Sequence, residues 1–457
     1  MKFLRLASAA VFAFAFGNAY AFHSGGVAEC EGCHTMHNSL EGASVFANEN
    51  TGKEYGTVLK SGPYLLKSST QSGACLNCHQ AADSSPSSYH ISTDDAKLTP
   101  GVAPVEMTPG GDFAWLKKTY TFLQRGSPTV EEGDRHGHNI IAPDYGFLQD
   151  KAQVAAPGGT YPAASLHCSS CHDPHGRYRR DAAGNISTTG LPIFGSGSYP
   201  SALMDAFPQA TQNGPTYPVA GKSAAGVYRI LGGLGYIPKS QVGVAGVVPF
   251  GAQVPAAVAP STYNRSESAT QTHVAYGSGM SEWCANCHTG MLENGYTSGM
   301  ADLVHPAGNN AKLPQFIADN YNAYVSSGVM TNTDPKRAFS SLVPFELGTA
   351  NYNTLAPLAR TDDTIDQSAT TSANVMCLSC HRAHASGFES MARYNLSNEF
   401  MTIADQGGTA QYDASTTEGK INRGKSVAEQ TAAYYGRPAT AFGPYARNLC
   451  NKCHAKD

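Results

Sequence analysis

Twelve cysteines carry the most distinctive chemistry of this sequence, because they form six Cys-x-x-Cys pairs that are each followed directly by histidine. Numbered one to six along the chain, the motifs are Cys30, Cys33 and His34; Cys75, Cys78 and His79; Cys168, Cys171 and His172; Cys284, Cys287 and His288; Cys377, Cys380 and His381; and Cys450, Cys453 and His454. Histidine occupies 16 of the 457 positions, so chance would place one after all six pairs with a probability of about 10⁻⁹. The pattern is that of c-type haem attachment, in which two thiols hold the porphyrin and the next histidine binds its iron. We therefore predict six covalent haem c groups.

Other uses of cysteine fit this spacing less well. Disulfides are the usual state of cysteines in exported proteins, but they need no histidine beside each pair. A zinc protein would place its pairs for Cys₄ or Cys₂His₂ closure. A thioredoxin-like motif occurs once rather than six times. The six motifs use every cysteine, so none is left for a disulfide or a nucleophile.

The sixth coordination position of each iron decides between an electron carrier and an enzyme. Ten histidines remain outside the motifs, enough to close all six irons with two histidines each. Iron closed in this way transfers electrons and binds no substrate, whereas a methionine ligand, the rival possibility, would raise the potential. We expect the six distal ligands among eight histidines: His23, His37, His90, His138, His167, His175, His305 and His384.

Three of these candidates belong to a repeat. After motifs one, three and five the sequence continues as Cys-His-x-x-His, which adds His37, His175 and His384. The alternation with motifs two, four and six predicts three two-haem modules, within residues 22–100, 130–300 and 370–457. A histidine at this spacing can reach only a neighbouring haem. On that logic His37 would serve haem two, His175 haem four and His384 haem six.

The other candidates rest on local context. His136 and His138 lie two residues apart, so we expect only one to bind iron and favour His138. Weaker positions are His90 after motif two, His305 before a proline, His167 beside Cys168, and His23 near the start of the mature chain. His136 and His273 are interpreted as ordinary surface or packing histidines.

The composition defines the setting of these sites. Residues 1–21 form a secretory signal with a charged start, an apolar stretch and the cleavage site Ala19-Tyr20-Ala21. The apolar stretch is too short to span a membrane, and no later one is longer. A net charge of −4 without a basic stripe argues against nucleic acid. With 47 glycines, 26 prolines and 14% charged residues, residues 22–457 should form a single domain.

We predict a multihaem cytochrome c fold, mostly coil or loop with a few short helices and minimal strand, packed around six haems. Leu313, Phe316, Ile317, Tyr321 and Tyr324 recur at helical spacing. Ser426 and Glu429 form a capping box for a helix that Gly436 should end. Residues 118–123 could form a strand, and 181–222 and 239–272 read as long loops. Trp115 and Trp283 are expected to pack against haem.

Five segments carry a resemblance to a known family. They are FHSGGVAEC at 22–30, TMHNS at 35–39, LHCSSCHDPHG at 166–176, GMSEWC at 279–284 and NKCHAKD at 451–457. Together with the six motifs, they resemble the OmcS-type extracellular hexahaem cytochromes of metal-reducing bacteria. The resemblance implies a bis-histidine electron carrier that polymerises head to tail into a filament, in which His37 binds haem five of the next subunit. It also implies outer-membrane cytochrome conduits as donors, and iron oxides, electrodes or partner cells as acceptors.

Two other functions are consistent with the same motifs. One is a monomeric electron shuttle in the periplasm or on the outer surface. The other, less favoured, is a multihaem reductase of nitrite, hydroxylamine or a sulfur oxyanion, which would need one open iron. Some such reductases replace the motif histidine by lysine, and no Cys-x-x-Cys-Lys occurs here. We therefore expect an electron carrier and no catalytic residues.

Overall fold

The computed structural model describes most of the chain. The described residues are 30–35, 39–40, 43–44, 63–81, 90–174, 231–233, 235–252, 254–258, 267, 273–292, 305–327, 334–360, 366–415, 419 and 421–454. The expected signal at 1–21, the loop at 181–222, and His23, His37 and His175 lie outside these ranges. No helix in the described part of the chain is long and apolar enough to cross a membrane.

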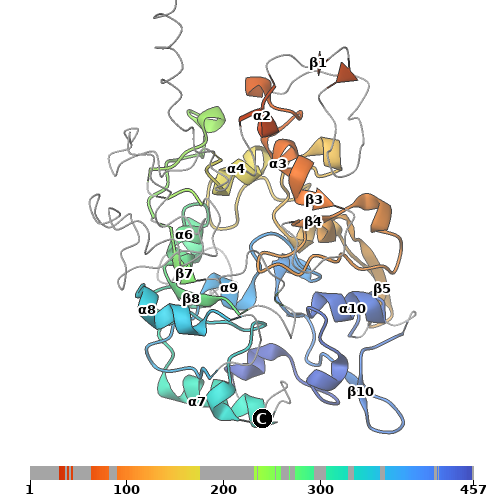
Figure 1. The fold of residues 1–457 in the computed structure, drawn as a ribbon. Coiled ribbons are helices and arrows are strands. Elements are labelled where there is room, and N and C mark those ends of the chain that lie inside the picture. Colours follow the sequence, from red (N-terminus) through yellow and green to blue (C-terminus); the bar gives the residue numbers. More distant parts are fainter. Residues whose placement is uncertain are drawn as a thin grey trace, which may run out of the picture.

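The attachment motifs lie on short helices that follow one another down the molecule (Figure 1). Four helices hold both cysteines of a motif: α2 (Cys30–Cys33) for motif one, α3 (Gln71–His79) for motif two, α4 (Cys168–Cys171) for motif three and α9 (Cys377–Cys380) for motif five. In motif four, α6 (Met280–Cys284) ends at the first cysteine, and Cys287 follows the helix. Motif six lies on a 3₁₀ turn, Leu449–Lys452, close to the carboxyl terminus. One helical turn suits the motif, because it brings the thiols at positions i and i+3 to the same side.

Three further helices support the lower half of the molecule: α7 (Gln315–Ser327), α8 (Tyr352–Leu355) and α10 (Val427–Ala433). The first confirms the predicted helix, although Phe316 is 64% exposed and does not share the buried face of Ile317 and Tyr321. The last confirms the capping box, since Ser426 Oγ accepts from the Glu429 amide and the Glu429 carboxylate accepts from the Ser426 amide.

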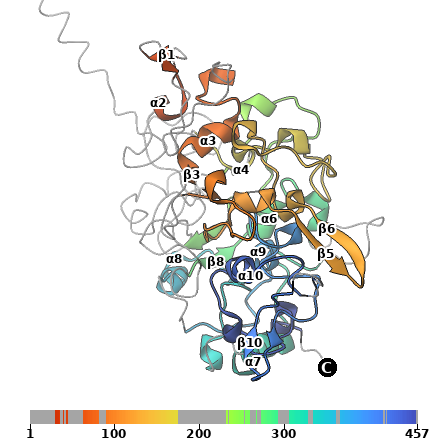
Figure 2. The same ribbon diagram turned by 90° about the vertical axis from the view of Figure 1, so that its right-hand side faces the viewer.

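Strands in the described part of the chain are short and occur in pairs. The longest pair is the antiparallel hairpin of β5 (Tyr120–Gln124) and β6 (Ser127–Glu131), which lies at one edge of the molecule (Figure 2). β5 confirms the strand expected at 118–123 with slightly different bounds, whereas β6 was not predicted. The other pairs are β1 (Ser39–Leu40) with β2 (Ala43–Ser44), β3 (Gln80–Ala81) with β4 (Ser92–Thr93), β7 (Ala256–Val258) with β8 (Ala275–Ser278), and β9 (Ile403–Ala404) with β10 (Ala410–Gln411). The fold is therefore mostly loop, as predicted.

Buried apolar side chains gather around the motifs rather than in one separate core. One cluster surrounds Leu76 in motif two, and another surrounds Leu378 in motif five. The largest joins α7 and α10 to motifs five and six. Trp115 is buried in this largest cluster, whereas Trp283 is half-buried and donates from Nε1 to the Gly232 carbonyl at 2.7 Å. The loops thus pack against the attachment helices, where the sequence predicted a coat around haem.

Candidate functional site

In the described part of the chain, three pairs of histidine rings lie opposite each other, at a separation that would accommodate one metal ion between the two rings. The ring centroids of His138 and His288 lie 6.0 Å apart, those of His172 and His384 lie 6.4 Å apart, and those of His305 and His454 lie 5.9 Å apart. An imidazole nitrogen binds a transition metal at about 2 Å, so two imidazoles on opposite sides of one ion have centroids roughly 6 Å apart. Each pair joins a motif histidine to one from outside the motifs. The spacing fits haem iron with two axial histidines.

Hydrogen bonds set the orientation of these rings. Nδ1 of His138 donates to the Ala383 carbonyl at 2.8 Å, Nδ1 of His288 to that of Pro157 at 2.9 Å, and Nδ1 of His305 to that of Pro306 at 2.8 Å. A proton fixed on Nδ1 leaves the Nε2 lone pair for a metal, which is the usual arrangement around metal-binding histidines. These rings are therefore prepared as ligands by the surrounding backbone.

Burial keeps two of the opposing histidines neutral. It lowers the pKa of His138 to about 4, and the neighbouring His288 adds to this effect. It lowers the pKa of His384 to about 3, with His172 contributing in the same direction. Iron binds neutral imidazole, so depressed pKa values favour the ligand form over the whole neutral range.

His136 and His273 differ from these ligands, as predicted. His136 is fully buried, with Nδ1 against the Trp115 carbonyl at 3.1 Å and Nε2 against the Glu131 carboxylate at 2.9 Å. Both ring nitrogens of His136 are thus engaged by oxygen atoms, and neither is left for iron. His273 packs its ring 3.9 Å from that of Phe339 and donates from Nδ1 to the Leu358 carbonyl. The choice of His138 over His136 agrees with this geometry.

The structure changes the expected partner of His384. Its ring lies against His172 of motif three, whereas the ring that faces motif six belongs to His305. The expectation that His384 serves haem six is wrong on this geometry. The cause is backbone contact, because the His384 amide donates to the Gly110 carbonyl and its own carbonyl accepts from the His138 amide. These bonds turn the segment after motif five toward motif three.

Two other candidates lie close to motifs two and three. His90 is buried where β3 pairs with β4, next to Ile91, whose amide donates to the His79 carbonyl. His167 precedes motif three at the start of α4, with Nδ1 3.3 Å from Ser72 Oγ. Burial lowers the pKa of His167.

The motifs form one spatial series. The interacting thiols join motifs one and two (Cys33, Cys75), two and three (Cys75, Cys168), three and four (Cys171, Cys287), four and five (Cys284, Cys377), and five and six (Cys380, Cys450). No disulfide joins any of the eleven cysteines whose side chains are described. Groups attached to successive motifs would therefore be neighbours along the whole series.

Cys78 is placed differently from the second cysteines of motifs three and five. Cys171 and Cys380 are the last residues of their single-turn helices, whereas Cys78 lies inside α3, which continues to His79. The half-buried Cys78 thiol interacts with that of Cys75 within the same motif. The structure thus departs from the uniform single turn that the repeated spacing suggests. Haem attachment through Cys78 stays a prediction.

Cys453 is the second cysteine of motif six and directly follows the 3₁₀ turn that carries Cys450. It is half-buried, and burial raises the pKa of its thiol to about 12, with Cys380 of motif five adding to the effect. Its side chain packs against the largest apolar cluster, as does that of Cys380 in motif five. Haem attachment through Cys453 also stays a prediction.

Motifs one, three and five share a backbone arrangement. The proximal histidine pairs as a short antiparallel bridge with a later residue: His34 with Leu66, His172 with Leu231, and His381 with Ala392. The carbonyl of the second cysteine then accepts from the next amide along, that of Lys67, Gly232 or Arg393. At motifs three and five a serine inside the pair, Ser170 or Ser379, also accepts from the backbone amide of the N-cap residue. The odd motifs are thus structural equivalents.

Buried cations stand beside motif five. Arg382 and Arg393 are buried and both bind the carboxylate of Glu267, at 2.7 and 2.9 Å. Arg382 also stacks on Tyr435, with its guanidinium carbon 3.4 Å from the ring centroid. Three nitrogens of these two side chains have no hydrogen-bond partner among the described residues: Nε and Nη2 of Arg382, and Nη2 of Arg393. Such donors suit the acidic propionate edge of a haem.

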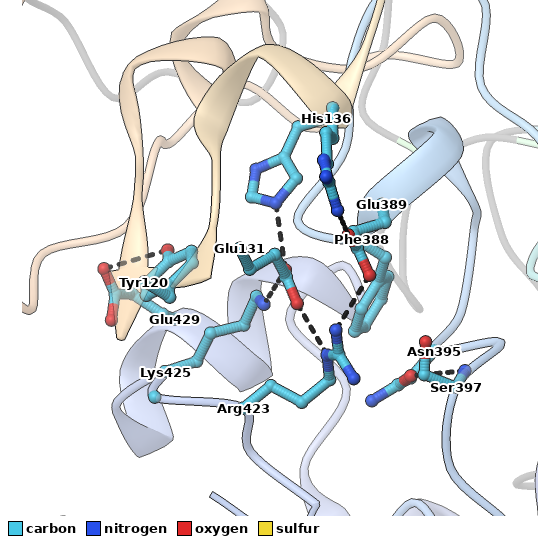
Figure 3. A network of polar contacts seen from close by, with 12 residues as sticks. Tyr120, Glu131, His136, Phe388, Glu389, Asn395, Ser397, Arg423, Lys425 and Glu429 are labelled. Atoms are coloured by element: carbon cyan, nitrogen blue, oxygen red, sulfur yellow. Dashed lines mark hydrogen bonds and ion pairs between the residues drawn. The ribbon is translucent and has the colours of Figure 1, made fainter. Parts of the chain in front are cut away.

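A second buried network supports the segment after motif five (Figure 3). The Glu131 carboxylate accepts from Lys425 Nζ at 2.6 Å, from Arg423 Nε at 2.6 Å and from His136. Arg423 also binds Glu389 at 2.8 Å. Glu389 begins the turn whose next residue, Ser390, accepts from Nδ1 of His381 at 2.7 Å. The network therefore ends at the hydrogen bond of a proximal histidine.

Sequence reasoning did not find the residues that orient the ligands. Most are backbone carbonyls, which leave no mark on the sequence. One signal was present: Ser72 and Ser281 each lie three residues before the first cysteine of motifs two and four, within Ser-x-x-Cys-x-Asn-Cys-His. Their hydroxyls accept from the amides of Cys168 and Cys377, at 3.1 and 3.0 Å.

The comparisons with known proteins agree with this site. No family model matches the chain. It is 57% identical over 440 residues to the curated C-type cytochrome OmcS of Geobacter sulfurreducens, covering 96% of this chain and 95% of that protein. Two solved structures of OmcS filaments, one described as cryo-EM of nanowires, match with a TM-score of 0.77 and 54% identity over 95% of this chain and all of theirs. The chain belongs to the OmcS family of c-type cytochromes, and its cofactor is haem c.

Proposed function

We propose that this chain transfers electrons outside the cell through six bis-histidine haems, as the subunit of a polymeric cytochrome filament. The observation that carries the proposal is the set of three histidine pairs at iron spacing, each centred on a different motif. Haem iron held between two histidines cycles between the ferric and ferrous states without binding substrate. The protein contributes the axial imidazoles, their orienting carbonyls and the loops that exclude water.

The pair of His172 and His384 suggests the distal ligands of all odd motifs. His384 lies three residues beyond the proximal histidine of motif five and faces motif three, which is the preceding odd motif. The odd motifs are structurally equivalent, so the same step assigns His175, after motif three, to the iron of motif one. By the same step, the iron of motif five would take the histidine that follows the next odd motif. That motif is motif one of a following copy of the chain, and the histidine is His37.

The even motifs suggest a parallel rule. His138 lies between motifs two and three and faces motif four, while His305 lies between motifs four and five and faces motif six. Each histidine therefore lies between an even motif and the next odd motif, and binds the iron of the even motif that comes after that odd motif. Applied to the stretch before motif one, the rule assigns His23 to motif two. All six irons then have two histidines, and His90, His136, His167 and His273 remain outside the set.

Head-to-tail assembly follows from the same assignment. Within one chain the iron of motif five has no partner in the rule, and His37 has no iron, so two copies complete each other. The match to OmcS filaments over 95% of the chain supports this assembly. A filament outside the cell would receive electrons from outer-membrane conduits and deliver them to iron oxides, electrodes or partner cells. The signal at 1–21 would export the chain, and closed irons make it a carrier and not an enzyme.

A paired substitution tests the proposal. His37→Ala removes the ligand assigned to the following haem, and His167→Ala removes a histidine assigned to none. We expect the first variant to incorporate six haems, to show a high-spin ferric signal in electron paramagnetic resonance, and to form no filaments in negative stain. The second should match the unaltered protein. Filaments with six low-spin haems in the His37 variant would overturn the assignment of His37 to the following haem. Failure of the unaltered protein to polymerise would overturn the filament and leave a monomeric shuttle as the alternative.

A further inference from the structure

Two buried serines fasten neighbouring motifs together in the same way. Ser72 Oγ accepts from the amide of Cys168 at 3.1 Å, and Ser281 Oγ accepts from the amide of Cys377 at 3.0 Å. Ser72 is fully buried and Ser281 almost fully so. Each bond joins residues about a hundred positions apart in the chain. Two independent junctions therefore share one contact.

The contact gives a hydrogen-bond acceptor to a backbone amide that has no partner within its own attachment helix. Cys168 and Cys377 are the first residues of α4 and α9, and the first amides of a helix have no partner within it. An amide that is buried without a hydrogen-bond partner destabilises the folded protein. The serine of the preceding motif supplies the missing acceptor, so the start of one attachment helix is held against the helix before it.

The same two junctions bring attachment sulfurs into contact. The thiols of Cys75 and Cys168 interact beside Ser72, and those of Cys284 and Cys377 interact beside Ser281. Both thiols of each contact would carry a vinyl edge of a haem. A shift of either cysteine backbone would therefore move one porphyrin edge relative to the next.

Motif six lacks this device. The residue three positions before Cys450 is Arg447, which binds Glu399 through Nη1 at 2.5 Å. The serine therefore occurs at the two described junctions where an even motif meets the next odd motif, and arginine stands at the equivalent position of motif six.

We infer that Ser72 and Ser281 are positioning residues for electron transfer, which fix the separation and orientation of the haems on motifs two and three and on motifs four and five. The inference rests on the proposed six-haem path. Transfer between haems depends steeply on the separation and mutual orientation of their rings. A hydroxyl that holds the attachment point of one haem against its neighbour thereby controls two of the five steps within the chain.

The double variant Ser72→Ala/Ser281→Ala tests this role in the full, haem-loaded chain. We expect it to bind six low-spin haems while the exciton couplet of neighbouring haems in Soret circular dichroism changes. After flash photoreduction, electron redistribution along the chain should slow several-fold. Ser340→Ala is the matched control, because Ser340 is buried and also accepts from a backbone amide, that of Leu342 at 3.2 Å, away from any motif junction. It should change neither readout.

The variant Ser72→Thr/Ser281→Thr keeps the hydroxyls and covers the case in which the alanine variant does not mature. A threonine pair with the couplet and the redistribution rate of the unaltered protein supports the inference. A threonine pair that shifts both readouts, or an alanine pair that behaves like Ser340→Ala, overturns it. Failure of the unaltered protein to redistribute electrons at all would instead contradict the proposed function.

Discussion

Motifs one and five orient their proximal histidines with the same backbone conformation. Nδ1 of His34 donates to the Tyr64 carbonyl at 2.9 Å, and Nδ1 of His381 donates to the Ser390 carbonyl at 2.7 Å. Both carbonyls belong to two-residue left-handed turns, with φ of 60° and 59° in one and 57° and 47° in the other. A non-glycine left-handed residue is strained, and strain of this kind persists where its surroundings require it.

The surroundings of the two turns differ. The motif-five turn is held from within, because Glu389 at its start binds Arg135 and Arg423, and Arg423 leads to the buried Glu131. The motif-one turn presents Tyr64 and Leu65 to solvent, 55% and 45% exposed. The same left-handed turn is thus held by buried ion pairs at motif five and exposed to solvent at motif one. Under the proposed assembly, the open turn lies at the end of the chain that meets another copy.

Loss of the Glu131 carboxylate should have the largest effect on this difference. Glu131→Gln leaves Lys425 and Arg423 buried without their counter-charge, so we expect a loss of about 3 kcal/mol in the free energy of unfolding. Guanidinium unfolding followed by circular dichroism measures it. Glu399→Gln, at the more exposed pair with Arg447, is the control and should cost less than about 1 kcal/mol. Equal losses would show that the network does not hold the motif-five side.

The same carboxylate gives the network a pH dependence. Burial alone would raise the pKa of Glu131, but the hydrogen bond from His136 and the charge of Lys425 outweigh it and keep that pKa well below its usual 4.5. The stability it contributes is therefore present above pH 4.5 and decreases as the pH falls below that value. Unfolding midpoints measured from pH 6 to 3 should fall more steeply for the unaltered protein than for Glu131→Gln. Parallel curves would contradict this.

A buried carboxylate without a cation should behave in the opposite way. Burial raises the pKa of Glu346, beside motif four, to about 8, with Glu282 adding to the effect. A raised folded-state pKa costs stability as the pH rises from 4.5 toward 8, because the folded protein holds a proton that the unfolded chain releases. Relative to the unaltered protein, Glu346→Gln should gain roughly 3–4 kcal/mol between pH 5 and pH 8. A gain that does not change with pH would exclude this assignment.

The open turn at motif one should affect assembly more than folding. Tyr64→Ser removes an exposed ring, so the free energy of unfolding should change by less than about 0.5 kcal/mol. Covering half of such a side chain with a second copy is worth about 1 kcal/mol, so filament formation should need a roughly fivefold higher protein concentration. Sedimentation of assembled material measures this. Val154→Ser, at a position 81% exposed, is the control, and equal effects would remove the motif-one turn from the interface.

The strain in the turns should give the smallest effect. Ser390 has a φ of 57°, which glycine adopts without a steric penalty, so Ser390→Gly should stabilise the protein by about 0.5–1 kcal/mol. The reverse change is available at Gly101, where φ is 77° and no described atom blocks a side chain, so Gly101→Ala should cost a similar amount. Thermal melting compares the two. A Ser390→Gly variant that loses stability would mean that this turn is not strained.

Local signals explain what the sequence could predict. The attachment motifs, the capping box at Ser426 and the helix at Gln315–Ser327 depend on residues within a few turns of one another. The hairpin was only half predicted, because β6 contains Pro128, which argues against a strand, and its turn depends on left-handed Arg125 and Gly126.

Long-range contacts explain what it could not. His138 receives its orientation from Ala383, 245 positions away, and no periodicity or spacing links the two. The assignment of His384 was wrong for the same reason, since the repeat after motif five gives a histidine but not the direction of its chain. Only the fold shows that the segment returns to motif three.

Cryo-electron microscopy of filaments formed by the mature protein tests the central claim most directly. We expect one iron between His172 and His384, one between His138 and His288, and one between His305 and His454, with His37 of each subunit on the iron of motif five of its neighbour. A map in which His384 binds the iron of motif six, or in which the iron of motif five is closed by a histidine of its own chain, would contradict the account.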